Sequence, residues 1–283
     1  MKHAVLLISC PDQRGITATV SNFIFEHNGN IVHADQHIDE QSNTFFMRIE
    51  WALEGFDIPG DDIPEMFRGL AGRFGMRWDL SLTSRRPKMA VFVSKPLHCL
   101  QDILLRHKAG QFRCDIPLII SNHPDARPIA ETYKIDFHEF PVEPDTKRSQ
   151  EEKEIGALTA AGVDFIFLAR YHQVLSLEFV RHFSDRIINI HHSFLPAFAG
   201  KNPYAQAYEK GVKIIGATSH YVTETLDEGP IIEQDTVRVS HRDTLQDLIR
   251  KGEDLEKVVA ARAIRLFLEK RILRYGNKTV VFD

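Results

Sequence analysis

The first part of the chain alternates between two hydrophobic patterns, one typical of strands and one typical of helices. An apolar run from His3 to Cys10 predicts a buried strand, and apolar residues from Ile16 to His27 recur at the helical spacing. Further strands are predicted at 31–39, 44–53 and 76–82, with a second amphipathic helix at 63–74. The resulting order, β-α-β-β-α-β, predicts a ferredoxin-like domain.

The pattern changes after a short polar stretch that ends at Pro87. We therefore predict a first domain at residues 1–84, a linker at 85–87 and a second domain at 88–283. In the second domain, apolar strands alternate with helical patterns, which predicts a doubly wound, Rossmann-like α/β sheet with a mainly parallel centre. The strands are expected at 88–93, 116–121 and 165–168, the helices at 97–109, 126–133 and 149–161, and the tail as a helix at 254–275 followed by a strand at 278–282.

Composition and charge narrow the class of protein. The 283 residues are 43% hydrophobic and 26% charged, which is ordinary for a globular protein, and the formal net charge is −4. A slightly acidic chain without a long run of Lys or Arg is a poor nucleic-acid binder. The apolar run at the start is too short to span a membrane and has no cleavage-site pattern. We therefore expect a cytoplasmic protein with neither a nucleic-acid nor a membrane partner.

The cysteines and histidines give no sign of a metal centre or of a disulfide framework. Cys10, Cys99 and Cys114 are odd in number and form no C-x-x-C pair. The doublet His191-His192 lacks the spacing and the additional ligands that a zinc site requires. We expect no metal.

A candidate for catalytic chemistry lies in the apolar strand that begins near Ile187. Asn189 and His191 occupy alternate positions and therefore point to the same face, just before a proline-containing loop. An amide and a protonated imidazole are suitable donors for an oxyanion, and Asp227 would add a carboxylate. From the residues alone, an alternative of similar weight is that Asn189 and His191 only satisfy buried backbone groups. His220 is interpreted as a core histidine.

Together these residues resemble a known catalytic domain. Asn189-Ile190-His191 with Ser193, Leu195-Pro196 and Gly200, followed by Asp227-x-Gly229-Pro230, is similar to the folate-dependent formyltransferases from Lys88 to Asp283. The resemblance implies that Asn189, His191 and Asp227 are the catalytic residues and that a folate is the small-molecule partner. It also implies a pterin pocket formed by residues 171–175 and 222–227, with contacts from Tyr171, His172, Val174, Leu175, Ile187, Val222 and Thr223.

Three departures from the transferases point toward hydrolysis. Glycinamide ribonucleotide transformylases hold the phosphate of their acceptor on a glycine-rich loop, but the matching loop here, residues 94–101, has no glycine. His192 replaces the usual proline, and residues 201–204 differ on the acceptor side, so His192 and Lys201 are expected to contact the substrate. The chain thus resembles the formyltetrahydrofolate deformylases, which implies hydrolysis of 10-formyltetrahydrofolate to formate and tetrahydrofolate.

Two other functions stay open at this level. One is transfer of the formyl group to an amine such as glycinamide ribonucleotide. The other is an amino-acid sensor whose catalytic domain has decayed, which the intact Asn189, His191 and Asp227 argue against. The folate is expected as a substrate, with no permanently bound cofactor.

The first domain carries a second resemblance. Asp12-x-x-Gly15-Ile16 followed by Asn28-Gly29-Asn30 is similar to the ACT domain, a regulatory module that senses amino acids. The resemblance implies an amino-acid effector near Asp12, Gly15 and Asn28. It also implies a homo-oligomer, because ACT modules usually pair their sheets.

Overall fold

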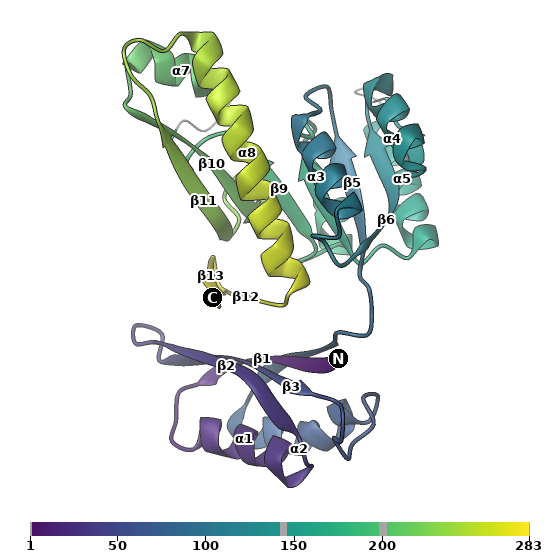
Figure 1. Cartoon of the computed structure of the whole chain (residues 1–283), viewed down its shortest axis with the longest axis vertical. Helices are drawn as coiled ribbons and strands as arrows, with labels where there is room; N and C mark the ends of the chain where they lie inside the picture. Colours follow the sequence, from purple (N-terminus) through teal and green to yellow (C-terminus); the bar gives the residue numbers. More distant parts are fainter. Residues whose placement is uncertain (1, 142–145, 198–202, 283) are drawn as a thin grey trace. The chain divides into compact units, whose positions relative to one another are not determined.

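The computed structural model describes residues 2–141, 146–197 and 203–282, which fold as two compact units (Figure 1). The first unit comprises Met1–Arg86 with Glu269–Tyr275 and Thr279–Asp283, and the second comprises Pro87–Leu268 with Gly276–Lys278. The first division falls between Arg86 and Pro87, inside the predicted linker. Within the described part of the chain, no helix is both long and apolar enough to cross a membrane.

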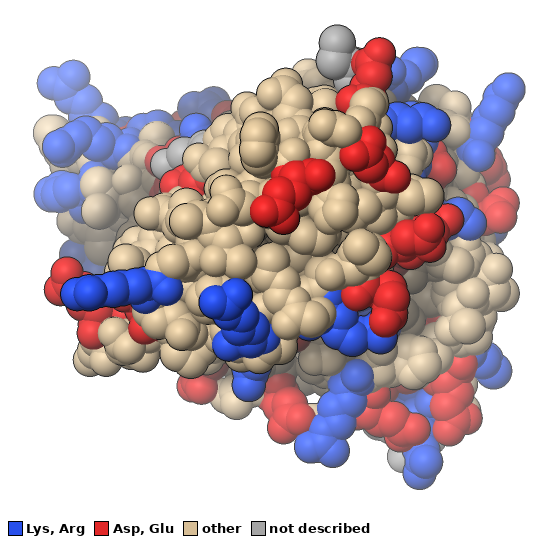
Figure 2. Space-filling model, turned by 90° about the horizontal axis from the view of Figure 1, so that it is seen from below, with Lys and Arg blue, Asp and Glu red and all other residues tan. Residues whose placement is uncertain are grey.

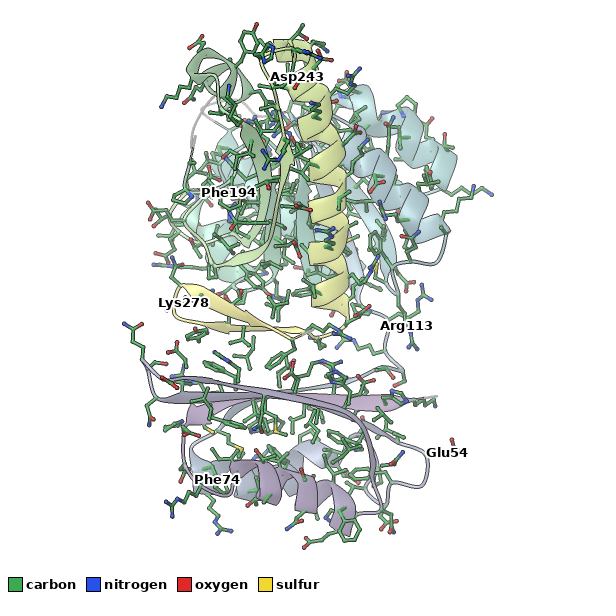
Figure 3. All side chains as sticks on the ribbon, turned by 60° about the vertical axis from the view of Figure 1, so that its left-hand side comes forward. Glu54, Phe74, Arg113, Phe194, Asp243 and Lys278 are labelled. Atoms are coloured by element: carbon green, nitrogen blue, oxygen red, sulfur yellow. The ribbon has the colours of Figure 1, made fainter. Side chains whose placement is uncertain are left out.

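The first unit has the predicted β-α-β-β-α-β order. Its antiparallel sheet has the strand order β2-β3-β1-β4 and two helices on one face (Figure 1). The elements are β1 (His3–Pro11), α1 (Ile16–Glu26), β2 (Asn30–Asp39), β3 (Thr44–Ala52), α2 (Ile63–Phe74) and β4 (Arg77–Leu82). Buried aromatic and aliphatic side chains, among them Ile8, Trp51 and Phe67, fill the space between this sheet and the helices. Figure 3 shows this layer, with Phe74 labelled at the end of α2.

The outer side of the two helices exposes some apolar residues. Phe25 on α1 is 76% exposed and Met66 on α2 is 51% exposed. Viewed from below, the molecule presents a largely uncharged face on which Lys, Arg, Asp and Glu lie mostly toward the edges (Figure 2).

The end of the chain differs from the prediction. The long helix α8 (Leu245–Leu268) ends before Tyr275, and β12 (Ile272–Tyr275) and β13 (Lys278–Val281) form a two-stranded hairpin. Most of this hairpin belongs to the first unit, not to the predicted second domain, because its apolar residues form a cluster with Leu7 and Phe46 of that unit's sheet. The sequence predicted a helix as far as residue 275 because Ile272 and Leu273 continue the helical spacing of apolar residues.

Arg48 explains why the helix ends where it does. This buried residue of β3 donates hydrogen bonds to the carbonyl oxygens of Lys270 (3.0 Å) and Glu269 (3.1 Å). Lys270 has a left-handed backbone, with φ of 54°, which breaks the helical path. A contact that is distant in sequence thus determines the end of the helix.

The second unit is the predicted doubly wound sheet. Its seven strands have the order β11-β10-β9-β8-β5-β6-β7, parallel from β9 to β7 and antiparallel at β10 and β11. The strands are β5 (Lys88–Val93), β6 (Asp115–Ser121), β7 (Asp136–Glu139), β8 (Phe165–Ala169), β9 (Ile187–His191), β10 (Ile214–Tyr221) and β11 (Ile231–Arg238). The other elements are α3 (His98–Lys108), η1 (Pro124–Ala126), α4 (Arg127–Tyr133), α5 (Lys147–Ala161), α6 (Leu177–His182), α7 (Pro203–Lys210) and α8. The strand order reverses between β5 and β8, and ligands bind beside such a reversal in open α/β sheets.

Candidate active site

Two neighbouring strands position the polar side chains of the candidate site. Asn189 and His191 lie on β9, at its carboxyl end, as the alternation predicted. The antiparallel strand β10 places His220 directly opposite Asn189. The Ser219 hydroxyl also donates to the Asn189 carbonyl at 3.1 Å, which fixes the two strands to each other at this point.

A tight loop brings Asp227 to the same place. Asp227 has a left-handed backbone with φ of 55°, a conformation that costs energy for a residue other than glycine and that the surrounding loop must hold in place. Gly229 then passes so close to the end of β10 that an added Cβ would lie 1.7 Å from the Tyr221 carbonyl oxygen. The glycine is required for this close approach, and without it the loop could not hold Asp227 here.

The three predicted catalytic residues meet around one carboxylate. His191 Nδ1 lies 3.4 Å from Asp227 Oδ1, and His220 Nε2 lies 3.7 Å from the same oxygen. Asn189 Nδ2 lies 3.2 Å from His220 Nε2. The structure therefore brings Asn189, His191 and Asp227 together and adds His220, which the sequence interpretation had left in the core.

His220 contributes to the geometry of Asn189. Its Nδ1 lies 2.9 Å from the Tyr221 carbonyl oxygen, to which it donates. Burial lowers the pKa of His220, so the ring is neutral and its Nε2 is left as an acceptor. The Asn189 amide must then donate one N–H to Nε2, which fixes the orientation of the amide. The one sequence signal for this role was a histidine in an otherwise uninterrupted buried strand.

The charges favour an ionised Asp227, and His191 presents a ring nitrogen beside it. Burial alone would raise the pKa of Asp227, but the hydrogen bond from His191, followed by the electrostatic interaction with that ring, lowers it overall. His191 is 6% exposed, and its Nε2 has no hydrogen-bond partner among residues 2–141, 146–197 and 203–282. A buried ring nitrogen without a partner, beside an ionised carboxylate, is well suited to bind a substrate oxygen.

Hydrogen bonds from the antiparallel strands hold the loop that follows His191. Thr218 on β10 donates to the Ser193 carbonyl at 2.8 Å and accepts from the Leu195 backbone N–H at 3.0 Å. Gln234 on β11 donates to the Leu195 carbonyl at 3.0 Å. The rigid loop keeps the end of β9 in place.

The residues predicted to bind the pterin ring fall into two groups. Tyr171, Leu175, Ile187 and Val222 belong to one apolar cluster of the second unit. Tyr171 is buried and its hydroxyl is hydrogen-bonded to Glu154, so its polar atom is already paired within the chain. His172 and Val174 are exposed, while Thr223 is half-buried in the loop that leads to Asp227. Lys201 lies outside the described residues.

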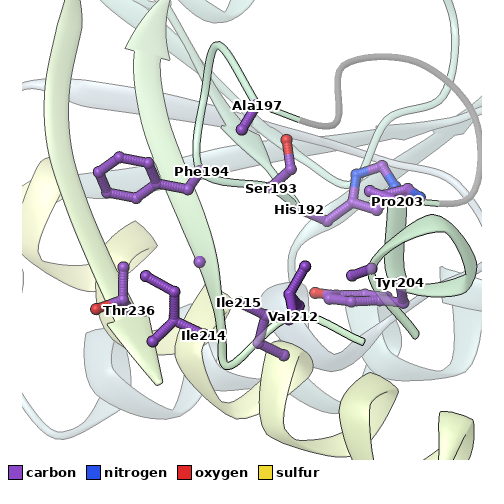
Figure 4. Close-up of a pocket in the computed structure, with 12 residues that line it drawn as sticks. His192, Ser193, Phe194, Ala197, Pro203, Tyr204, Val212, Ile214, Ile215 and Thr236 are labelled. Carbon is purple, nitrogen blue, oxygen red and sulfur yellow. The ribbon is translucent and has the colours of Figure 1, made fainter. Parts of the chain in front are cut away.

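His192 lies next to His191, on the border of an apolar pocket. Its ring centroid is 5.1 Å from that of His191 and 5.8 Å from that of Tyr204. Burial, followed by the charges of Arg170 and His191, lowers its pKa to about 3, so the ring is neutral. The pocket has a volume of about 200 Å³ and is lined mainly by apolar residues around Phe194 and Ile215 (Figure 4). Asn189, His191 and Asp227 are not among its lining residues, so it is a neighbour of the candidate site.

One other group in the second unit has metal-ligand chemistry. Ligand atoms of His98, Cys99 and Glu256 lie within 4.8 Å of one another. The Arg170 guanidinium already lies beside this carboxylate, with Nε 3.4 Å from Oε2 of Glu256. Burial also raises the pKa of Cys99 well above its usual value, which keeps the thiol neutral. These groups suit an internal ion pair better than a cation.

The residues predicted to bind an effector in the first unit do not converge. Asp12 and Gly15 precede α1, and Gly15 has the left-handed φ of 91° that starts the helix. Asn28 follows the same helix and donates to Asp57 at 2.7 Å. The length of α1, about 1.5 Å per residue, separates the two ends.

Comparison with known families gives matches to both units. Residues 87–264 match the formyl transferase family and residues 4–57 match the ACT domain. A formyltetrahydrofolate deformylase of a Synechocystis species is 54% identical, with coverage of 99% of this chain and 98% of the relative. The enzyme of the same name from Bacillus subtilis is 47% identical, with coverage of 98% and 93%.

Solved structures agree with these matches. A formyltetrahydrofolate deformylase from Pseudomonas syringae superposes with a TM-score of 0.98 at 44% identity and covers 100% of this chain and 95% of its own. A glycinamide ribonucleotide transformylase from Symbiobacterium toebii gives a TM-score of 0.66 at 33% identity, covering 70% of this chain and 95% of its own. Similarity to the deformylases thus extends over both units, whereas the transformylase matches a smaller share of the chain.

Proposed function

The chain belongs to the formyl transferase family as a formyltetrahydrofolate deformylase, and from this premise we propose that Asn189, His191 and Asp227 catalyse its reaction. The enzyme hydrolyses 10-formyltetrahydrofolate to formate and tetrahydrofolate. One observation carries the assignment: an amide, a buried imidazole whose Nε2 has no partner in the described part of the chain, and an ionised carboxylate lie together at the end of β9.

Each group has one task in the proposed mechanism. The oxygen of a water molecule forms a bond to the formyl carbon while Asp227 accepts a proton from that water. The former carbonyl oxygen becomes an oxyanion, which accepts hydrogen bonds from the Asn189 amide and from Nε2 of a protonated His191. The bond between the formyl carbon and N10 then breaks, and N10 takes up the proton held by Asp227. Tetrahydrofolate leaves with formic acid, which releases its remaining proton to solvent as formate.

The test of the catalytic carboxylate is Asp227→Asn, which keeps the size of the side chain and removes the base. We expect the variant to fold and to lose nearly all turnover, because the amide that replaces the carboxylate does not accept the proton of water. His191→Ala should lower turnover about 10²–10³-fold, the usual effect of losing one oxyanion donor. Formate release from 10-formyltetrahydrofolate without any amine is the measurement. Glu228→Gln, an exposed acid in the same loop, is the matched control, and substantial residual hydrolysis in Asp227→Asn would refute the scheme.

We further propose that the first unit binds a small amino acid near Asp12 and Gly15, in keeping with its similarity to ACT domains. Thermal unfolding with and without glycine or methionine tests this, because a ligand that binds only the folded state raises the melting temperature.

We also propose a homo-oligomer, since β2 is an edge strand with several exposed residues that is open to pairing with a second copy. Light scattering of the full chain tests the oligomer, and a strictly monomeric mass would contradict it.

A further inference from the structure

The place where the strand order of the second unit reverses is filled by a buried polar cluster. Four side chains meet at the carboxyl ends of β5 and β8: His98 begins α3, Arg170 follows β8, Tyr204 lies on α7 and Glu256 lies in the middle of α8. We call these four residues the Glu256 cluster. A crevice at such a reversal, next to the start of a helix, is the usual site for an anionic ligand in open α/β sheets.

Glu256 is bound in this cluster as an anion. Its side chain is 0% exposed, and Oε1 accepts a hydrogen bond from the Tyr204 hydroxyl at 2.5 Å. Oε2 lies 2.8 Å from His98 Nε2 and 3.4 Å from Arg170 Nε. Burial alone would raise the pKa of Glu256, but the hydrogen bond from His98 and the charge of Arg170 lower it overall. A carboxylate of the chain itself therefore has the surroundings expected of a bound anion.

Polar groups of Ser94 and His172, next to the Glu256 cluster, form hydrogen bonds within the chain. Ser94, directly after β5, donates its backbone N–H to the Arg170 carbonyl at 3.2 Å and its hydroxyl to Asn122 at 2.7 Å. The Ser94 hydroxyl in turn accepts the His172 N–H at 3.0 Å. Gly252 leaves the space that the Tyr204 ring needs, since an added Cβ would lie 2.1 Å from the Tyr204 hydroxyl. The chain's own atoms thus occupy both the hydrogen-bonding groups near Ser94 and the space beside Gly252.

The Glu256 cluster is connected to the catalytic residues. The Tyr204 ring that donates to Glu256 packs against His192, which packs against His191. We propose that Glu256 occupies, as an internal anion, the crevice that would otherwise bind an anionic group of a formyl acceptor, and thereby leaves water as the acceptor. This inference rests on the proposed function of Asn189, His191 and Asp227. An incoming phosphate would have to displace a buried carboxylate from its donors. The free energy lost by leaving that carboxylate without its partners is not offset by the contacts that the phosphate, which is solvated before it binds, would gain.

The experiment removes the internal anion and offers an external one. Glu256→Ala leaves the donors and a cavity, and Glu256→Gln removes the charge at nearly constant volume. Wild type and variants are given 10-formyltetrahydrofolate with glycinamide ribonucleotide, and formate and formylated amine are measured together. In the transfer reaction the acceptor nitrogen forms a bond to the formyl carbon, the bond to N10 breaks, and N10 gains the proton that the amine loses. We expect the ratio of transfer to hydrolysis to rise by about tenfold or more, the effect of one regained charged contact.

A second readout does not depend on catalysis. Inorganic phosphate should raise the melting temperature of Glu256→Ala by about 2–4 °C at saturating concentration and leave wild type unchanged. Glu253→Ala is the matched control, because Glu253 is a half-buried acid one turn earlier on α8 whose Oε1 lies no closer than 3.9 Å to Nδ1 of His98. This variant should behave as wild type in both measurements.

Several results would overturn the inference. One is a folded Glu256→Ala or Glu256→Gln that keeps the wild-type ratio of products and ignores phosphate. Another is a wild-type enzyme that transfers the formyl group to the amine or is inhibited competitively by phosphate, a result that needs no variant to fold. Failure of the proposed function can be distinguished from failure of this inference. It would appear as a wild-type enzyme that does not hydrolyse 10-formyltetrahydrofolate, or as undiminished hydrolysis by Asp227→Asn.

Discussion

At the scale of single residues, the site depends on which atoms donate and which accept. His220 donates from Nδ1 to the Tyr221 carbonyl, so its Nε2 is an acceptor for Asn189. The second N–H of that amide is then available to the substrate oxygen. His220 therefore acts as a positioning residue, because in the proposed mechanism it bonds to Asn189 and not to the substrate.

We predict that His220→Leu lowers kcat by about tenfold with little change in KM, since the loss of one hydrogen bond costs about 1–1.5 kcal/mol and frees the amide to rotate. His220→Gln should recover part of the lost rate, because an amide oxygen can accept from Asn189. Steady-state kinetics of both variants are the measurement. Equal losses in the two variants, or a change confined to KM, would contradict the positioning role.

The neutral state of His192 predicts a dependence of stability on pH. Its pKa is lowered to about 3 in the folded protein by burial and by the charges of Arg170 and His191, whereas an unfolded histidine titrates near 6.5. Below about pH 6.5 the unfolded chain binds a proton that the folded chain does not, so stability falls as the pH falls toward 3. The His192 contribution to this slope is about 1.4 kcal/mol per pH unit.

Urea unfolding of wild type and of His192→Asn at pH 7 and pH 5.5 measures this contribution. The variant should lose less stability than wild type on acidification. His182→Asn, at an exposed histidine of the same unit, should keep the wild-type slope. Parallel pH profiles for wild type and His192→Asn would show that His192 does not titrate as described.

At the scale of elements, short loops at the ends of strands place the reactive groups. β9 and β10 determine where Asn189, His191 and His220 lie, whereas the loop from Val222 to Pro230 determines where Asp227 lies. The loop follows the end of β10 closely, and this close approach depends on Gly229. The position of the loop against β10 is thus as important to the site as the alternation of side chains along β9.

We predict that Gly229→Ala lowers kcat by about 10²-fold, because the new methyl group would push the loop away from Tyr221 and displace Asp227, and a displacement of about 1 Å can have this effect. Turnover and thermal unfolding are measured together. Gly156→Ala, on α5, is the control, since its Cβ would meet no heavy atom within 4 Å. Full activity in Gly229→Ala would mean that the loop does not depend on this contact.

At the scale of the whole molecule, the chain enters the first unit twice. After α8 it returns as a hairpin that belongs to the first unit, and the buried Arg48 binds the carbonyl oxygens of Glu269 and Lys270 there. Arg48 also pairs with Glu50 at 2.8 Å. The first unit is therefore complete only when the end of the chain has been added to it.

We predict that Arg48→Met destabilises the first unit by about 2–4 kcal/mol, because two buried carbonyl groups and the Glu50 carboxylate lose a charged donor. Hydrogen exchange of the amides in β1 and β3 measures this in the full chain. Arg77→Met, at an exposed position on β4 of the same sheet, serves as the control and should be nearly neutral. Unchanged protection in Arg48→Met would show that the hairpin is held by its apolar residues alone.

The sequence by itself determined the elements whose hydrophobic period is long and regular. It predicted the β-α-β-β-α-β order, the doubly wound sheet and the shared face of Asn189 and His191, since these follow from local periodicity. It left out the short elements β7, α6 and α7 and the strands β10 and β11, and it extended α8 into β12, where the decisive contact is Arg48, more than 200 positions away in the chain.

Only the tertiary structure decided how distant residues combine. The role of His220 depends on the register of β10 against β9, and the Glu256 cluster joins four separate elements whose polar residues, taken singly, are typical of any solvated surface. Register and long-range packing are set by the burial of whole faces, so a local pattern of residues does not contain them. For this reason the proximity of Asn189, His191 and Asp227 was predictable from their motif, whereas the contact between His220 and Asn189 and the Glu256 cluster were not.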